Sequence, residues 1–271
     1  MTDFTSVRHR VKYCEREIKN LIATQNDSLS GPWSIRSTTS EDSKILEQTL
    51  TIDDDYVYRQ SMKLSAIVHH LRSTLDNIVY LIATSKATLG DKERRNLYFP
   101  IIEDIGKWAN NPTRNLFKNR CENKYYQLLL HMQPFASNLA WDGCAANPLM
   151  LLHTYSNEDK HRQIKVTYLK VNNLDFEVSF RFRKESETCI PRGTIFPKAF
   201  RTGGLIQRFE LDNSFESFVS NSTIESELWV EGIDMPAKKF LSDCLLVVQA
   251  IAENFERIGE VADWNSSFNE Y

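Results

Sequence analysis

The sequence is short of the residues that build several common kinds of site. Only 9 of its 271 residues are glycine, and neither a GxGxxG fingerprint nor a P-loop occurs, so these dinucleotide and nucleotide sites have no support. No GxSxG elbow accompanies the many serines. The 5 cysteines are scattered, odd in number and form no CxxC pair. This spacing argues against a zinc cluster and against a disulfide framework.

Long apolar runs and a strong net charge are also lacking. No run approaches the roughly 18 apolar residues that a membrane helix needs, and the N-terminus has no apolar signal core. A net charge of -3 gives no overall attraction to nucleic acid or to an anionic membrane. We therefore expect a cytoplasmic protein with no membrane partner and no cofactor.

Apolar residues at helical spacing predict most of the helices. A proline following an asparagine, Asn147-Pro148, predicts a helix start with asparagine as the N-cap. A further short helix is expected around Trp108 in the polar stretch 104–120. The helices expected from periodicity cover residues 7–23, 55–87, 122–132, 147–162 and 236–261.

Alternating apolar and polar residues predict strands. Residues 33–36 and 45–52 suggest a short hairpin, and Asn172-Asn173 suggests the turn of a second one. The other expected strands cover residues 165–171, 174–182, 205–211 and 224–230. The order of elements predicts an α+β fold, a helical bundle core with an antiparallel β-sheet packed on one side. We expect a mainly helical part with a short hairpin over 1–164, and a sheet plus a returning helix over 165–271, integrated in one domain.

Two charged clusters interrupt otherwise apolar helices. In the first, His69, Arg72 and Asp76 form a row along one edge of the apolar stripe, while His70 points away and is expected at the surface. In the second, Asp159 and Arg162 continue the face of Leu152 and Tyr155. Charges on a core-facing stripe are costly unless they are paired, so something must hold them there.

Two explanations of these clusters stay open. In the structural one, Arg72 pairs with Asp159 and Asp76 pairs with Arg162, which ties two core helices in one register. In the functional one, His69, Arg72 and His161 are catalytic residues that bind phosphate and move protons without a metal, with RNA as the substrate class. Asp76 and Asp159 would then orient them. A metal site with His69, Asp76, Asp159 and His161 as ligands is a third option, but the two arginines would repel a cation and no known ligand motif is present.

Three short motifs resemble a group of uncharacterised bacterial proteins. The motifs are Arg72-Ser73-Thr74-Leu75-Asp76, Phe99-Pro100-Ile101 and Asp159-Lys160-His161-Arg162. In that group an HxLRxxLD helix is combined with a DKHR helix end, and the resemblance spans residues 64–162. It implies a bacterial, soluble protein and no particular activity.

The chain also distantly resembles the HEPN superfamily, helical-bundle ribonucleases of bacterial toxin and antiphage systems. That resemblance implies a metal-independent ribonuclease that acts as a homodimer, with its site at the dimer interface. The signature is an arginine followed four to six residues later by a histidine. No single helix here has that spacing, so only Arg72 combined with His161 would imitate it.

A local basic stretch offers nucleic-acid contacts. Arg114, Lys118, Arg120 and Lys124 lie among aromatic residues, which is typical of an RNA-facing patch and more often of a solvated helix face. The leading hypothesis is a binding or interaction protein whose partner is unknown, either a protein or RNA. The alternative is a HEPN-like ribonuclease of a toxin or phage-defence system.

Overall fold

The computed structural model describes residues 2–23, 32–86, 88–136, 147–161, 167–182, 192–195 and 204–260. The helices are α1 Thr5–Ala23, α2 Asp54–Lys86, α3 Asp91–Arg95, α4 Ile105–Trp108, α5 Pro112–Arg120, α6 Asn123–His131, α7 Pro148–His161 and α8 Ala237–Glu260. The strands are β1 Trp33–Thr39, β2 Ile45–Ile52, β3 Thr167–Phe182, β4 Arg192–Ile195, β5 Gly204–Glu210, β6 Phe215–Val230 and β7 Met235–Pro236. Helices together with antiparallel strands confirm the predicted α+β class.

The chain divides into two compact units that alternate along the sequence. The helical unit comprises Met1–Leu21, Met62–Lys165 and Ala237–Tyr271, and the strand unit comprises Ile22–Ser61 and Val166–Pro236. Each unit therefore contains segments that are far apart in the sequence. No helix within the described ranges is both long enough and apolar enough to cross a membrane.

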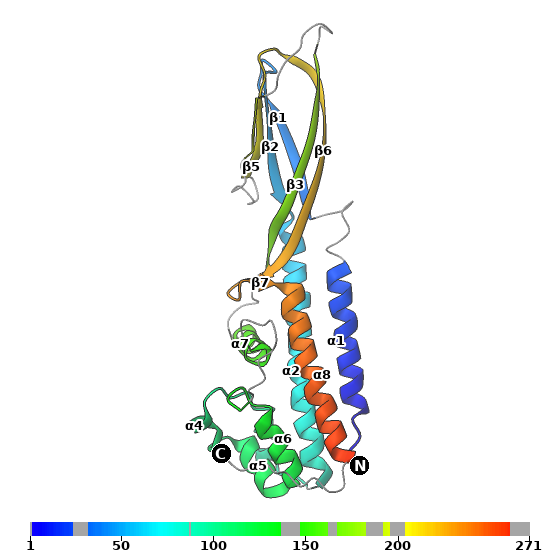
Figure 1. Ribbon diagram of the computed structural model, residues 1–271, viewed down its shortest axis with the longest axis vertical. Helices are drawn as coiled ribbons and strands as arrows, with labels where there is room; N and C mark the ends of the chain where they lie inside the picture. The colour runs from blue at the N-terminus through cyan, green and yellow to red at the C-terminus, as the bar shows by residue number, and fades with distance from the viewer. Residues whose placement is uncertain are drawn as a thin grey trace. The chain divides into compact units, whose positions relative to one another are not determined.

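The axes of three long helices, α1, α2 and α8, are roughly aligned in the helical unit (Figure 1). The buried face of α1 carries Val7, Cys14, Ile18 and Leu21 at helical spacing. Polar contacts join it to both neighbours: the Asn77 carboxamide of α2 donates to Ser6 Oγ over 2.9 Å, and Arg8 forms an ion pair with Glu256 of α8. The amphipathic pattern thus produces the helical core that the sequence predicts.

Helix α7 packs against α8. Its start is the predicted one, because Asn147 Oδ1 accepts a hydrogen bond from the Leu149 backbone N–H over 2.9 Å and Pro148 is the first helical residue. The buried rings of Tyr155 and Phe240 lie 5.4 Å apart between their centroids. α7 therefore has its apolar face in the core.

The strand unit consists of two antiparallel sheets. One has the strand order β1-β2-β5-β4 and the other has the order β3-β6-β7. Apolar side chains from both sheets form shared clusters, one around Leu46, Phe209 and Phe215. The buried Gln48 of β2 also donates to Ser220 Oγ of β6 over 2.9 Å. The two sheets thus pack face to face, as in a β-sandwich.

The hairpin predicted at Asn172-Asn173 is wrong. Strand β3 runs without a turn from Thr167 to Phe182 and pairs with β6 along its length. Its register shifts between Val171 and Asn173, so the extra residue is absorbed as a bulge. Strand β6 is correspondingly longer than predicted, because its polar first half pairs with the second half of β3.

Candidate functional site

Arg72, which the sequence singles out, is buried in the helical unit. It is 7% exposed, and its Nη2 donates to the backbone carbonyl of Phe99 over 2.6 Å and lies 3.2 Å from Asp76 Oδ1. The same carboxylate oxygen accepts the backbone N–H of Phe99 over 2.9 Å. Burial lowers the pKa of Arg72, and the Asp76 carboxylate opposes that shift. A guanidinium stays protonated even so, which makes this a charged pair.

The Arg72–Asp76 pair satisfies both backbone polar groups of one residue. Phe99 is fully buried and precedes Pro100, which has no N–H, so this segment cannot continue as a strand ladder. Buried backbone groups need partners, and here two side chains one helical turn apart supply them. The partner described for Arg72 is therefore on its own helix and on the segment that follows α3.

Neighbouring residues of the same extended segment are held by side chains from other elements. Thr113 Oγ1 of α5 donates to the Tyr98 carbonyl over 2.8 Å and accepts its N–H over 3.4 Å. Gln133, fully buried after α6, accepts the Ile102 N–H over 3.2 Å. We call residues 98–102 the clamped segment. Sequence reasoning missed Thr113 and Gln133, because an ordinary threonine and glutamine give no signal of their tertiary partners.

The two histidines of α2 differ in exposure, and the catalytic role predicted for His69 stays a prediction. His69 is exposed, whereas His70, expected at the surface, is half-buried with its ring 4.9 Å from that of Tyr13 in α1. Burial is the first cause that lowers the pKa of His70, followed by the charges of His69 and Arg10. Packing of Tyr13 from α1 therefore covers part of the His70 ring, which otherwise stays at the surface as predicted.

The second charged cluster lies at the end of α7. The helix includes Asp159 and ends at His161, but its side chains from Glu158 onward and all of Arg162 lie outside the described residues. The predicted pairs with Asp159 and Arg162, and the catalytic role of His161, thus stay predictions. Among the residues that the structure describes, no group of three His, Cys, Asp or Glu side chains could hold a metal ion.

Three of the four predicted nucleic-acid contacts have local partners. Arg114 donates to Asn115 Oδ1 over 2.9 Å, Arg120 is paired with Glu93, and Lys124 is paired with Glu122. Lys118 is exposed on α5, with no ion pair among the described residues. Most of this basic stretch is therefore occupied by contacts within the protein.

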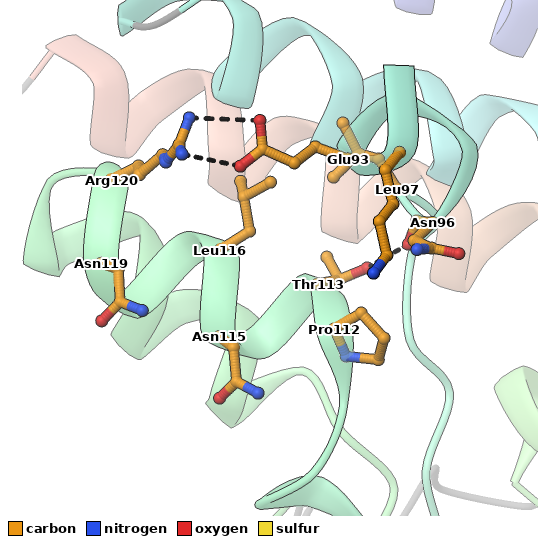
Figure 2. Close-up of a pocket in the computed structure, with 10 residues that line it drawn as sticks. Glu93, Asn96, Leu97, Pro112, Thr113, Asn115, Leu116, Asn119 and Arg120 are labelled. Carbon is orange, nitrogen blue, oxygen red and sulfur yellow. Dashed lines mark hydrogen bonds and ion pairs between the residues drawn. The ribbon is translucent and has the colours of Figure 1, made fainter. Parts of the chain in front are cut away.

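A pocket of about 300 Å³ lies between α3 and α5, and we call it the α3–α5 pocket (Figure 2). Arg120 of α5 reaches Glu93 of α3 with two contacts of 2.7 and 3.2 Å, as Figure 2 shows. The lining residues are Lys92, Glu93, Asn96, Leu97, Pro112, Thr113, Asn115, Leu116, Asn119 and Arg120. The lining thus combines three carboxamides and one ammonium with the apolar side chains of Leu97, Pro112 and Leu116.

Local sequence signals explain how the pocket is built. Asn111 caps α5, since its Oδ1 accepts the Arg114 N–H over 3.1 Å, and Pro112 begins the helix. Glu93 caps the start of α3 by accepting the N–H of the N-cap residue Gly90 over 2.9 Å. The asparagines at positions 96, 115 and 119 were visible in the sequence, but nothing in their spacing indicated that α3 would lie opposite α5.

Comparison with known proteins adds no assignment to this geometry. No family model matches the chain, and neither a curated protein sequence nor a solved structure is detectably similar to it.

Proposed function

We propose that this chain is a binding protein that takes up a partner on its helical unit, and that the Arg72–Asp76 pair is structural. The observation that supports this is the use of both side chains on the backbone of the buried Phe99. A group that stabilises charge on a substrate must be reachable by that substrate. Arg72 instead holds the clamped segment, which lies between α3 and α4 in the chain.

The segment that the Arg72–Asp76 pair holds is connected to a surface pocket. Thr113, whose hydroxyl holds Tyr98 in the clamped segment, also lies with its Oγ1 3.4 Å from the Asn96 carbonyl oxygen and lines the α3–α5 pocket. The buried clamps therefore fix the walls of an open pocket. Such an arrangement, a concave surface of mixed polar and apolar groups with hydrogen-bonded support beneath it, suits recognition of a partner.

The competing function is a metal-independent ribonuclease, and one experiment separates the two. Purified wild type and His161→Ala would be incubated with a mixed RNA pool and a chelator, and circular dichroism would verify folding. We expect the RNA to stay intact with both proteins. Cleavage by wild type together with a folded, inactive His161→Ala variant would overturn the proposal in favour of the enzyme.

A further inference from the structure

The α3–α5 pocket offers hydrogen-bonding groups that the protein itself leaves unused. Within the described ranges, the carboxamides of Asn96 and Asn119 and the ammonium of Lys92 have no hydrogen-bond or ion-pair partner. Asn115 uses its Oδ1 to accept from Arg114, which leaves its Nδ2 free to donate. A carboxamide donates and accepts at once, which is also what a peptide group does. The pocket is therefore chemically matched to a polypeptide backbone.

The remaining lining residues narrow the ligand class. Leu97, Leu116 and Pro112 give the pocket an apolar part that can hold one apolar side chain. None of the ten residues that line it is aromatic, whereas proteins that bind single-stranded nucleic acid usually stack bases on aromatic rings. The lining thus favours a polypeptide over RNA as the occupant.

The charges of the two helices beside the pocket favour an acidic ligand. Helices α3 and α5 together carry six Lys or Arg side chains and two acidic ones, although the whole chain has a net charge of -3. Glu93 is engaged by Arg120 and by the Gly90 N–H, so it does not neutralise Lys92. An acidic ligand is therefore attracted to this end of the helical unit, and Lys92 can pair with one carboxylate.

We infer that the α3–α5 pocket binds an extended, acidic segment of a partner polypeptide, with Asn115 and Asn119 on its backbone and Lys92 on an acidic side chain. This inference rests on the proposed binding function and names its ligand class. The two asparagines lie one helical turn apart on α5, so they can contact successive parts of an extended chain. The volume of about 300 Å³ suits a short contact of this kind rather than a large ligand.

A phage-displayed library of random peptides tests the inference. The full-length protein would be immobilised and used for selection, and bound phage would be counter-selected on the double variant Lys92→Glu with Asn119→Ala. We expect enriched peptides to be richer in Asp and Glu than the library. In fluorescence anisotropy, a selected peptide should bind the double variant about tenfold more weakly or worse, the loss expected for one charge-assisted hydrogen bond.

Controls make the outcomes separable. Lys238→Glu changes an exposed lysine of α8 and should leave peptide affinity unchanged, and circular dichroism would verify that each variant is folded. Selection that yields no pocket-dependent peptide, or only neutral or basic ones, overturns the inference. So does mixed-sequence single-stranded RNA that binds with the same dependence on Lys92 and Asn119. Either result differs from RNA cleavage that requires His161, which would overturn the proposed function itself.

Discussion

A single pair of side chains explains why two distant motifs occur together. Arg72 and Asp76 are one turn apart on α2, and both bind the backbone of Phe99, the residue before Pro100. Proline interrupts the backbone pairing that a buried extended segment would otherwise have. The Arg–Asp pair replaces that pairing, so the R-x-x-x-D and F-P motifs are parts of one contact.

Removal of Arg72 should therefore destabilise the helical unit. We expect Arg72→Ala to lower the free energy of unfolding by about 3 kcal/mol, because it leaves the Phe99 carbonyl unpaired in the core. Asp76→Ala should cost a comparable amount, because it leaves the Phe99 N–H unpaired and the buried Arg72 guanidinium without its counter-charge. Urea denaturation of both single variants and the double variant would measure the coupling between them.

Arg95→Ala is the matched control for that series. Arg95 is exposed on α3, so its loss should change stability by no more than about 0.5 kcal/mol. Equal stability of Arg72→Ala and Arg95→Ala would contradict the structural role of Arg72.

At the scale of elements, the contact between α1 and α2 contains a titratable ring. His70 lies against Tyr13, and its pKa in the folded protein is lowered below the ordinary value of 6.5, mainly by burial. Arg10 and His69 lower it further, and Glu17 opposes them. An unfolded chain therefore binds more protons at this position than the folded chain as the pH falls below about 6.5.

The sign of the pH dependence follows from this. The free energy of unfolding should decrease as the pH is lowered from about 7 to about 5. In His70→Phe this decrease should be smaller, because the variant keeps a ring at the contact but has no group that binds a proton. His70→Phe should remove only part of this pH dependence, because burial also lowers the pKa of His131. Urea midpoints at both pH values would measure it, with the exposed His9→Gln of α1 as the control. An unchanged pH dependence in His70→Phe would refute the assignment.

Elements differ in how well the sequence predicts them. Helices α2 and α8 were predicted to within about two residues of their bounds, since a long apolar stripe has one interpretation. Asn172-Asn173 misled because a turn signal and a bulge look alike until the partner strand is known. The contact between Arg72 and the Phe99 carbonyl could not be predicted from the sequence either, because every residue type has a backbone carbonyl and none marks it as a partner.

At the scale of the molecule, each unit has a core of its own. Leu46 is fully buried in the strand unit and Leu75 is fully buried in the helical unit. Replacing either leucine by alanine should cost roughly 2–5 kcal/mol. If the units are separate folding units, each substitution should affect mainly its own unit.

Hydrogen exchange measured by mass spectrometry would test this. Leu46→Ala should speed exchange in β2, β5 and β6 and leave the segment 62–86 of α2 unchanged, and Leu75→Ala should do the reverse. Equal acceleration throughout the chain in both variants would show a single cooperative unit instead.

The alternation of the two units along the chain sets an order for synthesis. Helix α1 leaves the ribosome before α8, yet its ion-pair partner Glu256 lies in α8, the last helix described. At the usual rate of elongation the two are made about ten seconds or more apart. The strand unit is completed late in that interval, because its last residue, Pro236, is made only about 20 residues before Glu256. The nascent chain must meanwhile keep the apolar face of α1 from associating with other chains.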